Sequence, residues 1–291
     1  MFSDPILVTG ASGQLGRLAV QRLIEAGASR IIATTRTPDR LAHLAADGVE
    51  VRYADFDDPQ TLVTAFAGAR SMALISTDAV GNGRRVNQHA NAIAAAKAAG
   101  IAHVVYTSGL NATASPMPGM VADHAATEAI LAASGIRHTV LRNSFYMEMA
   151  TSILGRADVE GRVAFASGSG RISYVARQDC AEAIAAALLA SDRGNRTLDI
   201  TGSRSFDVPE LVALAVKVQG RNLSALPVGP DELIALLVSG GTVEQMARVF
   251  ALIDVGVGKG AMDTVARDFS DLTGKSQMSL ETFLREQNLN A

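Results

Sequence analysis

A glycine-rich turn near the N-terminus has residue types and a spacing that suit phosphate binding. Its glycines stand at positions 10, 13 and 16, after a short apolar run and before a helical pattern. Gly10 permits a tight turn, Gly13 lets the backbone approach a diphosphate, and Gly16 lets the helix pack closely on the strand. Backbone N–H groups at the helix start then face the phosphates. We predict a dinucleotide site here; a glycine turn without a ligand is the alternative. The predicted contacts are Thr9, Gly10, Ser12, Gly13, Gln14 and Leu15.

The residue that ends the second apolar run indicates which dinucleotide the site prefers. Sites for NAD usually place an Asp or Glu about 20 residues beyond the turn, where it binds the ribose 2′-hydroxyl. In this chain Arg36 lies 20 positions after Gly16, and no acid precedes Asp39. A guanidinium suits a 2′-phosphate. We therefore favour NADP(H), with NAD(H) possible and a solvated loop cation as the alternative role of Arg36.

Polar residues also follow the later predicted strands. Ligands of open parallel sheets bind beyond the carboxyl ends of the strands, so these residues are expected to face one crevice. Asp55 and Phe56 suit an adenine edge and face, and Asn143 stands where the chain enters the crevice after the sixth strand. The further predicted contacts are Ser76, Thr77, Thr107 and Ser108.

The chain has no Tyr-x-x-x-Lys pair, in which a lysine lowers the pKa of a tyrosine that exchanges a proton with a carbonyl oxygen. None of the four tyrosines has a lysine four positions later, and no lysine stands between Lys97 and Lys217. Two other proton donors are candidates for a catalytic role. His124 is one, because an imidazole donates near neutral pH, and Tyr146 is the other, because it follows the sixth strand. Solvent exposure or helix capping is the alternative for His124, and core packing for Tyr146. The remaining four histidines are expected to be structural.

Methionines and aromatic residues cluster around the same predicted crevice. Methionine is flexible and polarizable, which suits a flat aromatic ligand. The predicted substrate contacts are Met117, Met120, Phe145, Tyr146 and Met149, with Met147 beside them. Ordinary core filling is the alternative. The proline-bearing loop Asn111–Met120 is a candidate lid over the substrate.

Strand-like and helical segments alternate through the first 145 residues. This alternation predicts βαβ units, and therefore an α/β fold with a Rossmann-like, doubly wound parallel sheet. Residues 161–170 are expected to be irregular, and Pro38–Ala46 to form a short helix. Asp207 and Glu210 predict a capped helix start, because the two residues have capping-box spacing. We assign residues 1–154 and 177–202 to the nucleotide-binding domain. Residues 155–176 and 203–291 form a smaller, mainly helical substrate-binding part.

Composition narrows the class of protein. The 291 residues carry a net charge of -3, so no basic excess draws the chain to nucleic acid. There is no membrane-spanning apolar run and no signal-peptide pattern, and the single cysteine excludes intramolecular disulfides. A cytoplasmic location is the simplest expectation. No metal-ligand spacing and no flavin motif is evident, so we expect neither a metal nor a flavin. The expected partner is a small-molecule aromatic substrate, and the sequence does not indicate an oligomeric state.

A spaced set of short motifs resembles the NmrA-like group of atypical short-chain dehydrogenases/reductases. The likeness is greatest to its bacterial quinone oxidoreductase and triphenylmethane reductase branch, and it spans nearly the whole chain. Besides the glycine turn, the matching pieces are Arg36-Thr37-Pro38, Val51–Asp55, Leu74-Ile75-Ser76, Ala95–Gly100, Val105–Ser108, Asp123-His124 with Thr127-Glu128, Leu141-Arg142-Asn143, and Asp254-Val255-Gly256 with Lys259-Gly260.

This resemblance implies NAD(P)H-dependent reduction of quinones or related polycyclic aromatic compounds, with tailoring of aromatic natural products as one setting. A quinone spreads the charge it accepts over its ring, so positioning against the cofactor supplies much of the catalysis. Two alternatives remain open at this point. One is a cofactor-sensing regulator without turnover, and the other is a carbonyl reductase that uses His124 or Tyr146 as donor.

Overall fold

The computed structural model describes residues 4–80, 82–115, 117 and 120–289. Its centre is a parallel sheet of seven strands in the order β3-β2-β1-β4-β5-β6-β8, which confirms the predicted doubly wound α/β fold. The strands are β1 (Ile6–Val8), β2 (Ile31–Thr35), β3 (Glu50–Tyr53), β4 (Ser71–Leu74), β5 (His103–Gly109), β6 (Arg137–Asn143) and β8 (Arg196–Ile200).

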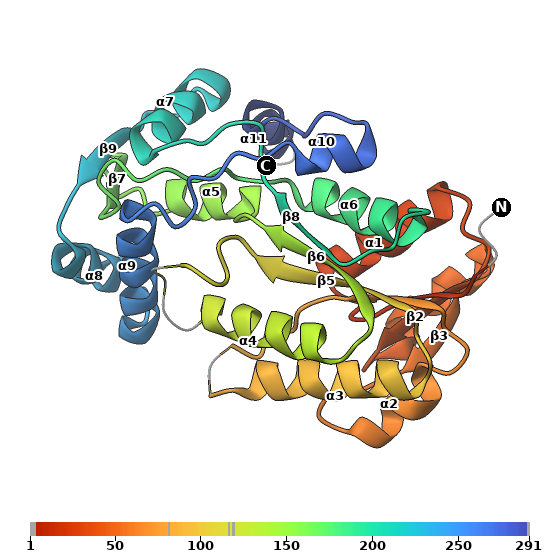
Figure 1. Ribbon diagram of the computed structural model, residues 1–291. Helices are drawn as coiled ribbons and strands as arrows, with labels where there is room; N and C mark the ends of the chain where they lie inside the picture. The colour runs from red at the N-terminus through yellow and green to blue at the C-terminus, as the bar shows by residue number, and fades with distance from the viewer. Residues whose placement is uncertain (1–3, 81, 116, 118–119, 290–291) are drawn as a thin grey trace.

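Helices cover both faces of this sheet. One face carries α1 (Gln14–Glu25), α6 (Arg177–Leu189) and α10 (Asp268–Thr273), and the other carries α2 (Pro59–Ala65), α3 (Arg84–Ala98) and α4 (Met120–Ala133) (Figure 1). The segment predicted as a short helix after β2 is a 3-10 helix, η1 (Pro38–Asp47).

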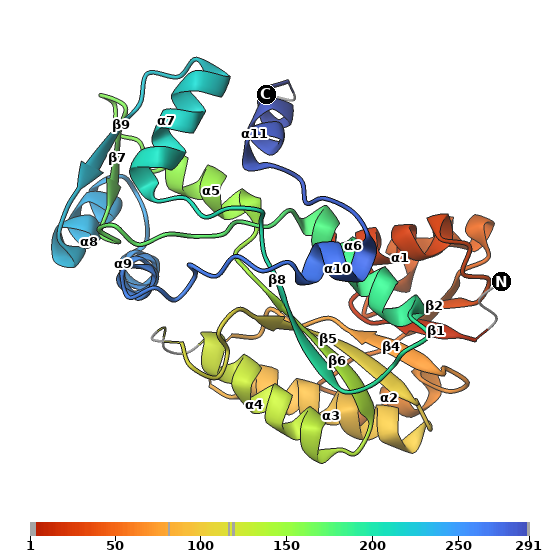
Figure 2. The same cartoon turned by 45° about the horizontal axis from the view of Figure 1, so that its top comes forward.

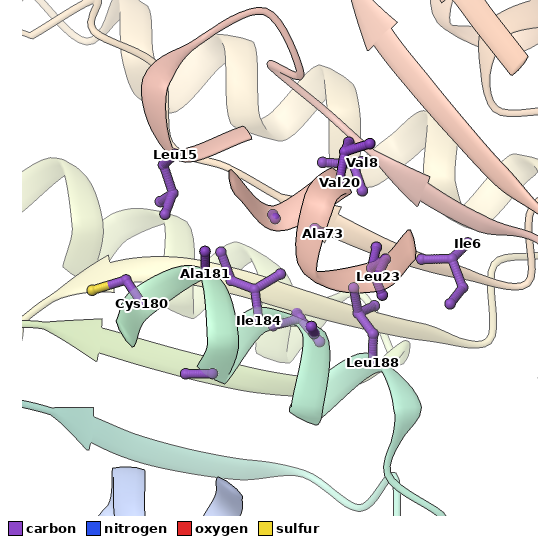
Figure 3. Packing of buried hydrophobic residues seen from close by; sticks show 14 of the residues in the cluster. Ile6, Val8, Leu15, Val20, Leu23, Ala73, Cys180, Ala181, Ile184 and Leu188 are labelled. Carbon is purple, nitrogen blue, oxygen red and sulfur yellow. The ribbon is translucent and has the colours of Figure 1, made fainter. Parts of the chain in front are cut away.

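The central strands are buried along their whole length because both of their faces are covered. Every residue of β1, β2 and β4 is buried. Figure 3 shows Leu23 of α1 beside Leu188 of α6, and Val20 of α1 beside Val8 of β1. The sheet and its helices therefore form a rigid base from which the loops at the strand ends project.

A smaller part lies beyond the carboxyl ends of the strands. It contains a two-stranded parallel sheet of β7 (Arg162–Phe165) and β9 (Ser224–Pro227), with α7 (Val208–Gln219), α8 (Pro230–Ser239) and α9 (Glu244–Gly258) around it (Figure 2). The remaining helices are α5 (Met147–Leu154) and α11 (Leu280–Leu289). The capping box at the start of α7 is present, as the spacing of Asp207 and Glu210 predicted.

The smaller part differs from the sequence expectation in one strand, β7. β7 falls within the segment that we expected to be irregular, because four residues between glycines give no alternation to recognise. Residues of α5 pack into the apolar cluster of the smaller part, whereas Phe269 of α10 packs into the core beneath α1 and α6. None of the described helices is both long and apolar enough to cross a membrane.

Candidate active site

Two adjoining cavities lie at the carboxyl ends of the strands. The first, which we call the turn cavity, has a volume of about 420 Å³ and runs along the glycine turn. The predicted contacts that line it are Gly10, Ser12, Gly13, Gln14, Leu15, Arg36, Asp55, Phe56, Ser76 and Thr77. Four different strand ends therefore supply most of the predicted cofactor contacts to this one cavity.

The glycine turn is shaped by backbone contacts that side chains would prevent. Gly10 has φ +60°, and a Cβ on Gly16 would lie 2.2 Å from the Gly10 carbonyl oxygen. Gly13 is the N-cap of α1, whose start has neither a side-chain cap nor an acidic residue in its first turn. The positive end of this helix is thus left for a ligand, and the lining of the turn cavity exposes it.

The far end of the turn cavity holds Arg36 with Asp55 and Phe56. Arg36 is exposed, and within the described residues it forms no ion pair with a carboxylate. This leaves the Arg36 guanidinium available to an anionic ligand group.

Replacing Arg36 with alanine should weaken NADPH binding about tenfold and NADH binding much less, because only NADPH carries the 2′-phosphate that a guanidinium binds. Titration of both nucleotides against the wild type and the variant measures this. Equal losses for the two nucleotides would contradict the predicted preference for NADP(H).

Two of the predicted contacts lie behind the cavity wall instead of lining it. Thr9 is fully buried; its hydroxyl donates to the Ala73 carbonyl at 3.0 Å and accepts from the Ile75 N–H at 3.0 Å. The Thr107 hydroxyl accepts from the Ser76 N–H at 2.9 Å. Both hydroxyls therefore hold the loop after β4 in position by accepting hydrogen bonds from its backbone N–H groups.

The second cavity, which we call the methionine cavity, has a volume of about 390 Å³ and adjoins the first. Predicted residues on its wall are Met117, Phe145, Tyr146 and Met149, with His124, Ser108 and Asn143. Ser76, Arg85 and Tyr146 line both cavities and form what we call the shared wall. Apolar side chains thus gather on part of this wall, and a flat aromatic ligand for this cavity stays a prediction.

Met147 does not follow the prediction, and the prediction for Met120 stays untested. The side chain of Met120 lies outside the described part of the chain. Met147 is buried and lines a separate hollow with Tyr174 and Phe206, because α5 turns that side towards the smaller part. Met117 reaches the cavity beside Gly256, where a Cβ would lie 2.2 Å from its Cγ.

His124 lies within α4, does not cap that helix, and has a buried side chain. Its Nδ1 lies 2.8 Å from the Tyr106 hydroxyl, and its ring borders the methionine cavity beside Gly109. Burial first, and the charge of Arg85 second, lower the pKa of His124 to about 4, so the ring is neutral at neutral pH. With the Tyr106 hydroxyl as the donor to Nδ1, the imidazole hydrogen is on Nε2. His124 can then donate a hydrogen bond, but it is not an imidazolium acid.

The buried His124 should make folding stability depend on pH. The unfolded chain takes up this proton below about pH 6.5, whereas the folded protein takes it up only near pH 4. The free energy of unfolding therefore falls as the pH drops through this window, and the contribution is fully present above it. His89, with its pKa lowered to about 3 by burial, acts in the same direction, and Asp179, raised by burial to about 6, opposes both.

Urea unfolding of the wild type and of His124→Gln between about pH 7 and pH 4 isolates this contribution. We expect the variant to lose less stability on acidification than the wild type. Parallel profiles for the two proteins would contradict the neutral, buried state of this ring.

Tyr146 stands on the shared wall under Arg177, whose guanidinium carbon lies 4.6 Å from the centre of the ring. Burial, the largest cause, raises the pKa of the Tyr146 hydroxyl well above its usual range. The hydroxyl therefore keeps its proton, as His124 keeps its neutral form. Both candidate donors can orient an oxygen by hydrogen bonding, and neither has a pKa near neutrality.

Several polar residues around the cavities were missed by sequence reasoning. Arg85 and Gln88 lie in the first turns of α3 and line the turn cavity, and Arg177 donates to Gln14 and pairs with Glu148 across the two parts. A signal for the first two was present, since Arg85, Gln88 and His89 occupy positions i, i+3 and i+4 on the buried stripe of a helix otherwise rich in alanine. Polar residues on that stripe point towards a ligand or a buried network.

The cavities retain buried polar atoms that a dinucleotide could satisfy. Thr77 Oγ1 and Gln88 Oε1 beside the turn cavity, and Asn143 Oδ1 beside the methionine cavity, have no hydrogen-bond partner among the described residues. Buried polar atoms in native proteins are normally paired, so such atoms indicate a missing partner. The residues present therefore fit a dinucleotide cofactor. No group of three or more potential metal ligands occurs among the described residues.

Comparison with known proteins gives consistent matches. A profile described as NAD(P)H-binding matches residues 10–191. Quinone oxidoreductase 2 of Escherichia coli is 35% identical over 276 residues, which cover 94% of this chain and 96% of that one. The crystal structure of the E. coli NADPH-dependent quinone oxidoreductase with NADPH has a TM-score of 0.90 at 32% identity, covering 97% of this chain and 99% of that one. The Citrobacter sp. triphenylmethane reductase with NADP(H) has a TM-score of 0.89 at 33% identity, with the same coverage.

Proposed function

The chain belongs to the NAD(P)H-binding family, as an NmrA-like atypical short-chain dehydrogenase/reductase, and from this membership we propose that it reduces quinone-like or polycyclic aromatic compounds with NADPH. The observation that carries the proposal is the shared wall of Ser76, Arg85 and Tyr146. It joins a cavity that suits a dinucleotide to a cavity lined by methionine and aromatic side chains.

The turn cavity supplies the groups that would hold the cofactor. The start of α1 at Gly13–Leu15 would receive the diphosphate, and Arg36 the 2′-phosphate. Asp55 and Phe56 would border the adenine, while Ser76 and Thr77 lie towards the shared wall. When bound there, NADPH supplies a hydride from its nicotinamide ring.

The methionine cavity favours a flat aromatic substrate. Met117, Phe145 and Met149 offer polarizable and planar surfaces, and Tyr146 closes the side nearest the turn cavity. Tailoring of aromatic natural products remains a prediction consistent with this shape. A cavity with these walls positions a ring by packing, so its contribution to the rate is mainly orientation.

The missing Tyr-x-x-x-Lys pair fits this class of substrate. A quinone needs little acid assistance, since its ring delocalises the accepted charge and water can supply the last proton. His124 and Tyr146, both neutral, would act as hydrogen-bond donors or positioning groups, without exchanging their own protons. A simple ketone would leave a localised alkoxide, for which neither group has a suitable pKa.

A spectrophotometric panel tests the proposal. Purified protein is mixed with NADPH or NADH and with a series of quinones and simple ketones, and loss of nicotinamide absorbance is followed. We expect turnover with quinones and little with ketones. Cofactor binding without any turnover would instead indicate a sensor, and ketone turnover that His124→Ala or Tyr146→Phe abolishes would indicate a carbonyl reductase.

A further inference from the structure

Arg85 is a buried cation without a hydrogen-bond partner on part of its guanidinium. It is the second residue of α3, is only 5% exposed, and lines both cavities from the shared wall. Its Nε and Nη1 atoms are buried and have no hydrogen-bond partner among the described residues. Buried guanidinium groups in proteins are normally paired, so these two nitrogen atoms point to a ligand.

The surroundings of Arg85 do not neutralise it in a direct contact. Asp123 and Asp78 are the carboxylates whose charges act on Arg85, and no ion pair joins either to Arg85 within the described residues. Burial is the main cause that lowers the pKa values of the neighbouring His89 and His124, and the charge of Arg85 adds to it. Arginine stays protonated in proteins, so the wall between the cavities carries a fixed positive charge.

A buried, unpaired charge lowers the stability of the protein unless a bound ligand compensates for it. Removing water from a cation costs free energy, and this cost is recovered only when an anion or a strong hydrogen-bond acceptor binds against the cation. The diphosphate of a dinucleotide would lie at the start of α1, and α1 and α3 cover opposite faces of the sheet (Figure 1). The charge of Arg85 instead faces the point where the two cavities meet, which is where a substrate oxygen would come to lie.

We propose that Arg85 is a catalytic residue that receives the negative charge developing on the substrate oxygen, and that it thereby takes the electrostatic role of the absent lysine. This inference rests on the proposed function. A quinone that accepts a hydride from NADPH becomes a hydroquinone monoanion, NADP⁺ is left, and one proton from water completes the hydroquinone. Arg85 gives up no proton in this scheme, because its unpartnered Nε and Nη1 act as preorganised hydrogen-bond donors to the oxyanion.

The neighbouring Arg84 provides a matched control. It precedes Arg85 on the same helix turn, but its side chain is 62% exposed and paired with Asp57 on the outer surface. Arg85→Met should lower kcat for quinones about 100-fold, as removal of an oxyanion donor does elsewhere, with little change in the Kd for NADPH. Arg85→Lys should recover part of the rate, and Arg84→Met should match the wild type.

Measurements of thermal stability and of cofactor affinity distinguish the catalytic role of Arg85 from a structural or a cofactor-binding role. Removing an unpaired buried charge should leave the Tm of Arg85→Met unchanged or raised, so a large fall in Tm would assign Arg85 to the structure instead. If the Kd for NADPH rose by the same factor as kcat/KM fell, Arg85 would be a cofactor ligand. An unchanged kcat in Arg85→Met would also overturn the proposal.

Binding of 4-nitrophenol gives a readout that needs no turnover. Its phenolate absorbs in the visible range, so the pKa of the bound phenol can be followed in the complex with NADP⁺. We expect wild type and Arg84→Met to lower that pKa below its value in water, and Arg85→Met not to. No binding by the wild type, or equal pKa values in all three, would overturn the proposal. A lowered pKa in a protein that reduces no quinone would sustain the anion site and refute the proposed function.

Discussion

Replacing Gly13 with aspartate should abolish cofactor binding, with a loss of at least about 100-fold in affinity, and leave the free protein as stable as before. The carboxylate would stand where the diphosphate is expected, at the start of α1. Two unit charges about 4 Å apart repel by about 4 kcal/mol near a protein surface, which exceeds the roughly 2.7 kcal/mol that a 100-fold loss requires. The same carboxylate suits the helix dipole when no ligand is present.

The conformation of Gly13 makes this substitution tolerable in the free protein. Its φ of -77° and ψ of 170° are accessible to any residue, and α1 has no side-chain cap that aspartate would displace. A Cβ there would lie 3.2 Å from the Gly10 carbonyl oxygen, which requires a small adjustment only. We therefore expect a change of less than about 1 kcal/mol in the free energy of unfolding.

Gly229→Asp is the matched control for this prediction. Gly229 is the uncapped N-cap of α8 with φ -73° and ψ 160°, and nothing lies within 4 Å of its Cβ position. This variant should have wild-type affinity for NADPH and wild-type or higher stability. Calorimetric titration and urea unfolding measure the two effects. Undiminished NADPH binding by Gly13→Asp would place the diphosphate somewhere other than the start of α1.

Replacing Asp254 with alanine should lower the free energy of unfolding by about 3–5 kcal/mol, because it leaves Arg156 buried without its partner. The two side chains are 7% and 8% exposed, and Arg156 Nη1 lies 3.1 and 3.2 Å from the two carboxylate oxygens of Asp254. Asp254 also accepts the Ala166 N–H at 2.9 Å. The pair thus joins α9 to the end of α5 and to the chain after β7, behind the wall of the methionine cavity.

An exposed pair on the same helix provides the comparison. Glu244 and Arg248 are more than half exposed and lie one turn apart on α9, so Glu244→Ala should change stability by less than about 1 kcal/mol. The double variant Arg156→Met, Asp254→Leu should lose much less than Asp254→Ala alone, because it removes both charges. Urea unfolding of the three variants measures these values. A loss below 1 kcal/mol in Asp254→Ala would show that water reaches the pair.

The sequence predicted the nucleotide-binding part of the fold well because periodicity and glycine spacing are local signals. The seven-stranded sheet, its helices and the glycine turn each depend on residues close together in the chain. β7 was missed because its identity depends on pairing with β9, about 60 positions later, and not on its own residues. The placement of α5 and α10 likewise depends on which surface each helix meets.

The site was predictable where strand ends supply it, and less so elsewhere. Gly13, Arg36 and Ser76 follow from the rule that parallel strands end at one crevice. Thr9 and Thr107 satisfy the same rule in sequence, but their hydroxyls bond to neighbouring backbone, which only the tertiary structure shows. Arg85 comes from a helix start, and its burial could not be read from its residue type, since arginine is usually exposed.

Calorimetric titration of the purified protein with NADPH and with NADH tests the central claim most directly. We expect one NADPH to bind per chain with greater affinity than NADH, and Gly13→Asp to lose this binding while Gly229→Asp retains it. If neither nucleotide binds the folded wild-type protein, the turn cavity is not a cofactor site and the account is contradicted.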